Sequence, residues 1–423
     1  MPASVRIIFS AKPHSVSLFN MPRILHHLKQ PYSGISRNMW LLALAMFINR
    51  SGAMVLVFMS VYLTKHMQFT IPQAGVVISM FGIGSLVGAY IGGKLVDRIG
   101  YYPILVGSLL LCGLMMITLG QMHSYPLIAF FTFMVTATGD AFRPANSASI
   151  AVYTKKENYP QSIALNRLAM NLGFTIGPMI GGILAVYNYQ LLFWADGLTC
   201  IAASAFIFFV LPRPARMHQE IESTENEKTE PIAQSSPFQD KPYLFFLVFT
   251  CLYATAFFQF FSSLPLFYKE SYQLSEKHIG WLLAFNGMGV AVVEMLLINY
   301  IQHRWTRFRF ISLGVVLLMG AYLVLIPIHS IWILVLSMIW ITASEMLAMP
   351  FMSTYAITRA PRSAMGRYTA LYSMSWSMAQ IMAPIIGTTI IAHFGFDTLW
   401  FVLSGIALIS FIGFRWLAQS EKN

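Results

Sequence analysis

Residues 173–182 read Gly-Phe-Thr-Ile-Gly-Pro-Met-Ile-Gly-Gly and lie inside an apolar segment that covers 160–188. Glycines that recur every four residues share one face of a helix, where they form a groove without side chains. A neighbouring helix can pack closely against such a groove or slide along it, and a proline adds a bend. The stretch therefore predicts either a packing interface alone or a hinge, and its candidate residues are Gly173, Gly177, Pro178, Gly181 and Gly182.

The rest of the chain is also apolar. Of its 423 residues, 57% are hydrophobic and 10% are charged, whereas a soluble domain has about 25% charged residues. The net charge of +11 comes from residues scattered between apolar segments and not from one patch. This composition excludes a soluble enzyme, a nucleic-acid-binding protein and a secreted disulfide scaffold. We predict a multi-pass protein of the lipid bilayer.

Membrane-spanning helices need about 20 apolar residues, and the chain contains twelve such segments. The polar stretch 212–241 has five glutamates and several prolines, is typical of a flexible linker, and separates six segments from six. We therefore expect an all-α membrane protein with an N-terminal tail (1–38), two six-helix bundles (39–211 and 242–417) and a C-terminal tail (418–423). The expected spans are 39–64, 73–95, 102–122, 124–152, 160–188, 190–211, 242–268, 276–301, 308–327, 330–357, 364–393 and 396–417.

The placement of lysine and arginine predicts the orientation. With both termini in the cytoplasm, the cytoplasmic side holds 21 basic residues and the opposite side holds three, namely Lys65, Lys269 and Lys277. We therefore expect a cell (inner) membrane protein with both termini cytoplasmic. The first 38 residues are basic and contain no acidic residue, which fits a cytoplasmic tail and equally fits an organelle transit peptide.

The two halves repeat each other. At an offset of 206 residues, Pro144 corresponds to Pro350 and Pro178 to Pro384. At an offset of 205, three glycines of the second segment meet three glycines of the eighth: Gly75, Gly82 and Gly84 correspond to Gly280, Gly287 and Gly289. A six-helix unit duplicated in parallel orientation is typical of transporters whose substrate site lies between the halves.

A second glycine-containing motif follows the second segment and reads Gly93-Lys-Leu-Val-Asp97-Arg98-Ile-Gly100. Glycine permits a tight bend between two helices. Asp97 can hold cations or cap the N-terminus of a neighbouring helix. An ordinary charged turn would explain any one of these residues, but explains the whole spaced set less well.

With these two motifs the chain resembles the major facilitator superfamily, specifically the twelve-helix group that includes drug–proton antiporters. Gly93, Asp97, Arg98 and Gly100 are similar to its signature loop, and 173–182 is similar to the antiporter signature of helix five. The resemblance covers 39–417. It implies that segments one, four, seven and ten line a central cavity and that two, five, eight and eleven form the contacts between the halves.

The sequence departs from this pattern at two places. Tyr101 and Tyr102 stand where the signature loop usually ends in two basic residues. The arginine that antiporters often carry within helix four is absent near Phe131–Phe133.

Ionisable residues inside apolar segments give the candidate site, because each costs about 2.5–3.5 kcal/mol on insertion scales. Asp140, Arg143 and Asn146 share a face of segment four, and we expect Asp140 to pair with Arg143 or with Arg167. Glu294 and Glu345 have no basic residue near them in their own helices. We expect these two carboxyl groups either to take up protons or to be held neutral by hydrogen bonds. We expect no charge deep within segments three, six, nine or twelve.

The proton-coupling candidates are therefore Asp140, Glu345 and Glu294. The candidates for the substrate cavity are Asn49, Arg50, Arg143, Asn146 and Gln259, and those for ion pairs or interfaces are Arg167 and Asn171. The cysteines and histidines show no metal-ligand spacing and no Walker phosphate loop occurs, so we expect no metal, no cofactor and no catalytic residues.

We predict a monomeric secondary transporter, and not an enzyme, that moves a small molecule by alternating access and is driven by protons. The helix-five resemblance favours efflux of amphipathic compounds. One alternative is a proton-coupled carrier for one metabolite, whose anionic group would suit Arg50, Arg143 and Arg167. An alternative of another class is a membrane-embedded transferase.

Overall fold

The structure is a computed structural model that describes residues 34–155, 158–213, 237–301, 304–326, 330–361 and 364–420. Most of the predicted N-terminal tail and of the linker, and half of the C-terminal tail, therefore lie outside the described residues. The first half contains α2 (Arg37–Ser51), α3 (Val55–Val61), η2 (Tyr62–His66), α4 (Ile71–Ile99), α5 (Tyr101–Leu119), α6 (Tyr125–Asp140), α7 (Phe142–Tyr153), α8 (Tyr159–Tyr187) and α9 (Gln190–Val210). The second half contains η4 (Pro237–Gln239), α11 (Lys241–Phe257), α12 (Gln259–Ser262), α13 (Leu264–Glu270), α14 (Glu276–Ile301), α15 (Arg307–Leu323), α16 (Ile331–Arg359) and α17 (Met365–Ser420).

The described chain forms helices and no strand, which confirms the prediction of an all-α membrane fold. Its helices are compatible with twelve spans. The first, fourth and seventh expected spans are each divided into shorter helices, and α17 holds the last two spans. At Gly395 a φ of +81° interrupts α17, so the chain bends there between these two spans.

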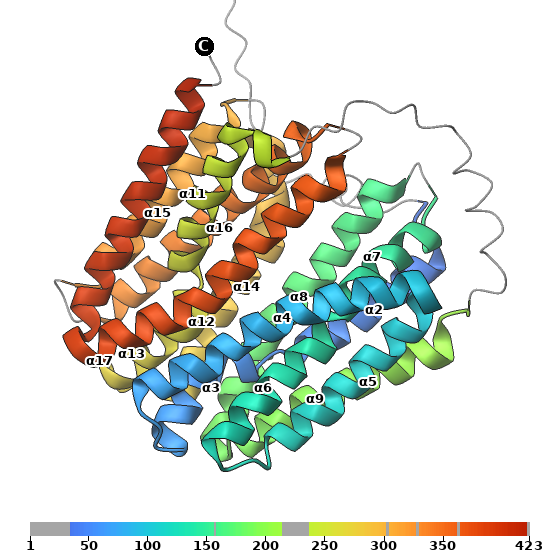
Figure 1. Cartoon of the computed structure of the whole chain (residues 1–423). Helices are drawn as coiled ribbons and strands as arrows, with labels where there is room; N and C mark the ends of the chain where they lie inside the picture. Colours follow the sequence, from blue (N-terminus) through green and yellow to red (C-terminus); the bar gives the residue numbers. More distant parts are fainter. Residues whose placement is uncertain are drawn as a thin grey trace, which may run out of the picture.

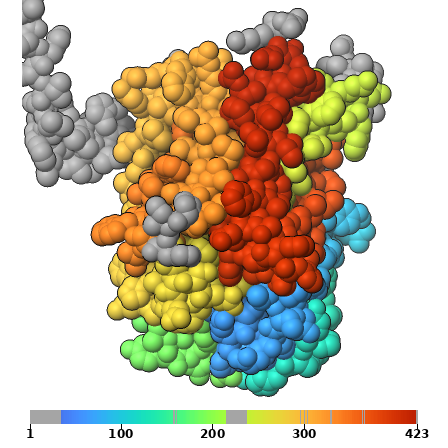
Figure 2. Space-filling view, turned by 90° about the vertical axis from the view of Figure 1, so that its left-hand side faces the viewer, coloured from blue at the N-terminus to red at the C-terminus, as the bar shows by residue number. Residues whose placement is uncertain are grey.

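Two ends of the molecule are distinguished by the connections between the helices. At the linker end, α4 ends at Ile99, α9 ends at Val210 and α11 begins at Lys241. At the far end, η2 ends at His66 and α14 begins at Glu276. The halves contact each other through α4 with α17, α8 with α14, and α3 with α12 and α13. Figure 2 shows the far end, where the blue start of the first half lies directly against red and yellow segments of the second.

Backbone contacts join the halves near the far end. A Cβ placed on Gly280 of α14 would lie 2.3 Å from the carbonyl oxygen of Pro178 in α8. A Cβ on Gly75 of α4 would lie 2.9 Å from the carbonyl oxygen of Pro384 in α17. These four residues are the pairs that the sequence repeat relates, so both contacts follow from one duplicated arrangement. The same holds one to two helical turns further along, where Gly287 lies against Thr175 and Gly82 against Ile381.

The halves separate toward the linker end. The ribbons of α4 and α17 diverge in that direction (Figure 1). One and two turns beyond Ile381, the side chains of Met378 and Met374 are 54% and 52% exposed. On α4, Tyr90 and Ile99 are 63% and 56% exposed. The molecule is therefore closed at the far end and opens toward the linker end between α4 and α17.

Gly280→Ala tests the contact between the halves. The added methyl group meets a backbone oxygen, which cannot rotate away, so we expect a loss of about 1–3 kcal/mol of stability and a lower unfolding temperature in detergent. Gly107→Ala is the matched control, because nothing lies within 4 Å of its added Cβ. This control is expected to unfold at the same or a higher temperature, since alanine favours helix by up to about 1 kcal/mol over glycine. Equal unfolding temperatures for the two variants would contradict the close contact.

Candidate functional site

The first and seventh spans are broken near their middle. α2 ends at Ser51 and α3 begins at Val55, and a Cβ on the intervening Gly52 would lie 1.7 Å from the hydroxyl oxygen of Thr199 in α9. In the second half, α11 ends and α12 begins around Phe258, which is 206 residues after Gly52. Broken helices expose backbone polar groups at mid-membrane, which is where transporters build their sites.

The glycine face of α8 packs against the break in the first span. Added Cβ atoms on Gly173 and Gly181 would lie 2.5 Å from the Cβ of Arg50 and 2.6 Å from the Cβ of Met54. Gly177 lies between them, 3.2 Å from the carbonyl oxygen of Ala53. The glycine groove of α8 that the sequence predicted therefore packs against the break between α2 and α3.

The next glycine of α8 faces the other half. A Cβ on Gly182 would lie 2.5 Å from the carbonyl oxygen of Glu276 and 3.2 Å from the Cα of Gly280. α8 therefore connects the broken first span to the contact between the halves.

A buried carboxylate, Asp196 of α9, stabilises this break. It is 5% exposed, and its Oδ2 atom accepts a hydrogen bond of 3.4 Å from the backbone N–H of Val55, the first residue of α3. The expectation that the sixth segment carries no deep charge is therefore wrong. The charge lies outside the cavity-lining segments because it satisfies backbone groups that the break in the first span leaves free. An acidic residue within an apolar run was the sequence signal for it.

The charges of the first half form one group. Arg143 donates from Nε to Asp140 Oδ1 at 2.9 Å, which is one of the two pairings expected for Asp140. Arg50 lies within electrostatic reach of Asp140, Arg143 and Asp196. Its guanidinium lies 5.4 Å from the ring centre of Phe174, and its Nε atom is buried without a hydrogen-bond partner among the described residues.

A second group of charges joins the two halves. Arg167 of α8 donates to Glu294 of α14 at 2.6 Å, with the carboxylate side chain 9% and the arginine side chain 54% exposed. Glu345 of α16 accepts a hydrogen bond of 3.1 Å from the amide of Asn286. Arg167 and Glu294 are its electrostatic neighbours. The structure thus brings together three candidates that the sequence placed in different segments.

The other polar candidates lie apart from this group. Asn49 donates to the sulfur of Cys200 at 3.3 Å, and Asn146 is buried with its Oδ1 atom unpaired among the described residues. Gln259 is fully buried, donates to the carbonyl oxygen of Ala383 at 2.8 Å and accepts from Ser263 at 2.5 Å. Its amide is therefore occupied within the second half and does not face a cavity in this conformation.

The remaining candidates, Asn171 and the signature-loop residues, lie in α8 and at the end of α4. The carbonyl oxygen of Asn171 in α8 accepts a hydrogen bond from Thr175 at 2.9 Å. In the signature loop, Gly100 has a φ of +83° and is the only residue between α4 and α5. Asp97 and Arg98 are exposed on the last turn of α4, and an added Cβ on Gly93 would have nothing within 4 Å.

Apolar side chains from both halves line a small cavity between them. Leu56, Ile78 and Phe81 come from the first half, and Phe258, Phe261, Ser262, Gln380 and Pro384 come from the second. Phe258 and Phe261 of the seventh expected span thus reach the interface between the halves.

A polar network at the far end escaped the sequence analysis. Lys65 of the first half pairs with Glu270 of the second at 2.8 Å. The hydroxyl of Tyr189 donates to Glu276 at 2.7 Å, and Lys269 pairs with the same carboxylate at 2.7 Å. Two of the three basic residues on this side are therefore ion-paired, and the network ties the halves together where they are closed.

Comparisons with known proteins agree with this architecture. A family model described as Major Facilitator Superfamily matches residues 40–379. A Na(+), Li(+), K(+)/H(+) antiporter of Planococcus maritimus is 24% identical over 406 residues, covering 88% of this chain and 93% of the relative. Multidrug resistance protein 1 of Bacillus subtilis (strain 168) is 23% identical over 316 residues, covering 74% and 79%.

Solved structures show the same fold. A POT family transporter in complex with 5-aminolevulinic acid superposes with a TM-score of 0.75 at 12% identity, covering 90% of this chain and 96% of that one. The nucleoside transporter NupG also gives a TM-score of 0.75 at 12% identity, covering 90% and 99%.

Exchange of charges tests the pair between the halves. Arg167→Glu and Glu294→Arg each place like charges together within the membrane, so each single variant is expected to lose transport. The double variant restores opposite charges and is expected to regain part of it, as measured by uptake or export at matched protein levels. A double variant that is folded and as inactive as both single variants would show that the pair is not required.

Proposed function

Because the chain belongs to the Major Facilitator Superfamily, and is therefore a secondary transporter and not an enzyme, we propose that it exports small amphipathic molecules in exchange for protons. The observation that carries this proposal is the Arg167–Glu294 pair between the halves, with Glu345 beside it. The 21-to-3 distribution of basic residues supports a cytoplasmic linker end. The molecule then faces the cytoplasm.

A proton reaching Glu294 removes the negative charge that holds Arg167. Glu294 has an arginine partner from the other half, whereas Glu345 accepts a hydrogen bond from the neutral amide of Asn286. Keeping a carboxylate charged within the membrane is costly without a cation. Glu345 is therefore the proposed proton carrier while Arg167 pairs with Glu294. When a proton reaches Glu294 instead, Arg167 exchanges its partner and pairs with Glu345.

The apolar cavity between the halves supports amphipathic substrates. Its volume of about 10 Å³ holds at most one water molecule in this conformation, so the support comes from the lining, which is aliphatic and aromatic with two polar side chains, Ser262 and Gln380. The multidrug resistance relative supports the same substrate class.

A second candidate function is exchange of monovalent cations for protons. Glu294 binds Arg167 and Glu345 lies within electrostatic reach of it, so displacing that arginine would leave oxygen ligands suited to an alkali cation. The name of the Planococcus maritimus relative supports this candidate.

Glu345→Gln tests proton coupling in proteoliposomes with an imposed pH gradient. The amide keeps the size of the side chain but cannot carry a proton, so gradient-driven export of amphipathic dyes is expected to fall about tenfold or more. Exchange of dye for unlabelled dye without a gradient is expected to persist. Asp397→Asn is the matched control, because this carboxylate is exposed at the far end.

Full gradient-driven export by the glutamine variant would remove Glu345 from proton coupling. If dyes are not exported but Na⁺ or K⁺ moves against the pH gradient, the second candidate is correct. If neither moves while the protein exchanges an anionic metabolite, the amphipathic proposal is wrong.

A further inference from the structure

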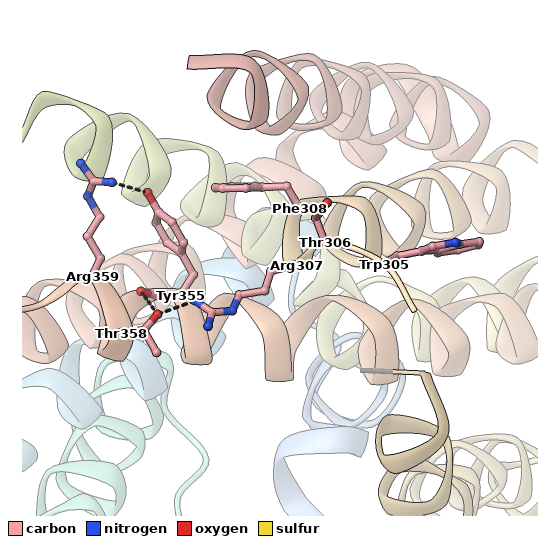
Figure 3. A pocket seen from close by; sticks show the side chains of 7 residues that line it. All are labelled: Trp305, Thr306, Arg307, Phe308, Tyr355, Thr358 and Arg359. Atoms are coloured by element: carbon pink, nitrogen blue, oxygen red, sulfur yellow. Dashed lines mark hydrogen bonds between the residues drawn. The ribbon is translucent and has the colours of Figure 1, made fainter. Parts of the chain in front are cut away.

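A pocket unconnected with the candidate site lies at the linker end of the second half (Figure 3). Its volume is about 680 Å³, and it forms where the chain enters α15 and where α16 ends. Figure 3 shows Arg307 pointing toward Thr358 and Arg359 toward the hydroxyl of Tyr355. The lining residues are Trp305, Thr306, Arg307, Phe308, Tyr355, Thr358 and Arg359.

One of the two arginines in the pocket is neutralised. Arg359 donates from Nε and Nη2 to the two carboxylate oxygens of Asp240 at 2.7 and 2.8 Å. Burial alone would raise the pKa of Asp240, but hydrogen bonds from Arg359, Tyr243 and Tyr368 outweigh it and hold that pKa below its ordinary value. Asp240 therefore stays ionised at neutral pH, and Arg359 serves mainly to join α16 to the start of α11.

The other arginine, Arg307, has no carboxylate partner among the described residues. It donates to the hydroxyl of Thr358 at 2.6 Å. A neutral hydroxyl fixes the direction of the guanidinium without cancelling its charge. The remaining N–H groups are then available to an anion, and the planar guanidinium suits the paired oxygens of a phosphate.

The start of α15 adds to the positive potential. Thr306 precedes this 17-residue helix, and its side chain makes no capping hydrogen bond. The positive end of the helix dipole therefore faces the same pocket as Arg307. A helix start and an arginine without a carboxylate partner in the described part of the chain both line this cavity, which favours an anion over any other ligand.

The surroundings of the pocket favour a lipid as the source of that anion. Trp305 is 52% exposed at a helix end, where tryptophan is typical of the membrane interface. Tyr300, 65% exposed, lies under the guanidinium of Arg304 at 4.0 Å. Leu296 of α14 and Ile357 of α16 are apolar and 61% and 46% exposed. Exposed apolar side chains of this kind can contact an acyl chain while its phosphate lies in the pocket.

We propose that this pocket binds the phosphate of an anionic phospholipid from the leaflet at the linker end. Arg307 and the start of α15 hold the phosphate, Thr358 orients the arginine, and Trp305 lies at the level of the glycerol backbone. Basic pockets between transmembrane helices are suited to such head groups. The proposal is independent of what the protein transports.

Binding to purified full-length protein tests the proposal by native mass spectrometry in a neutral detergent. The probes are short-chain phosphatidylglycerol, phosphatidylcholine of the same chain length, and inorganic phosphate. Wild-type protein is expected to bind phosphatidylglycerol in preference to phosphatidylcholine. Arg307→Gln is expected to weaken phosphatidylglycerol binding about tenfold, the effect of losing one hydrogen bond to a charged group.

Arg309→Gln is the matched control, because Arg309 is exposed on the same turn but does not line the pocket. It is expected to bind like wild type, and Arg307→Lys is expected to restore part of the binding by keeping the charge. Each variant is first checked by gel filtration, and only protein that elutes at the wild-type volume is compared. A folding defect is then not mistaken for a loss of binding.

Three results would overturn the proposal. Equal binding of the two lipids would show that no anion is selected. Equal losses in Arg307→Gln and Arg309→Gln would show a diffuse charge effect. Arg307-dependent binding of inorganic phosphate as strong as that of phosphatidylglycerol would assign the pocket to a soluble phosphate and not to a lipid.

Discussion

The two halves meet at the far end where glycines let helix backbones approach each other closely. Gly280 lies against the carbonyl oxygen of Pro178, and Gly75 lies against that of Pro384. Everything else in the molecule depends on this constraint. Because α4, α8, α14 and α17 are in contact there, they hold Arg167 within reach of Glu294 and place apolar side chains of both halves around one small cavity. Toward the linker end α4 and α17 diverge, whereas α8 and α14 stay joined by Arg167 and Glu294.

The sequence predicted the fold because a membrane imposes simple rules on it. The lengths of the apolar segments predicted the membrane spans. The repeated glycines and prolines predicted two related bundles, since only small residues allow such close helix contacts. The glycine series of α8 predicted a close contact but not its partner. That partner is a break in the first span around Gly52, and no local propensity distinguishes such a break from an ordinary glycine in a helix.

The candidate site was predictable in its members but not in its connections. Asp140 and Arg143 are three residues apart on one helix, so their pairing followed from helical spacing. Arg167 and Glu294 are 127 residues apart, and only the docking of α8 on α14 brings them together. Asp196 escaped prediction because its role depends on free backbone groups of another span. Gln259 was a candidate for the substrate cavity, yet its amide is occupied inside the second half.

The two contacts that the duplication produced are no longer equivalent. Where α8 meets α14, a Cβ added to Gly182 would lie 3.2 Å from the Cα of Gly280. Where α4 meets α17, the position corresponding to Gly182 is Thr388, whose hydroxyl would lie 1.9 Å from a Cβ on Gly75. At the first contact, neither helix can gain a side chain unless the helices part. At the second, one helix already carries a side chain and the other supplies all the space for it. A random substitution can therefore disrupt the first contact at two positions, Gly182 and Gly280, but the second contact only at Gly75. The two copies of the repeated unit now differ in the number of positions at which a side chain is not tolerated.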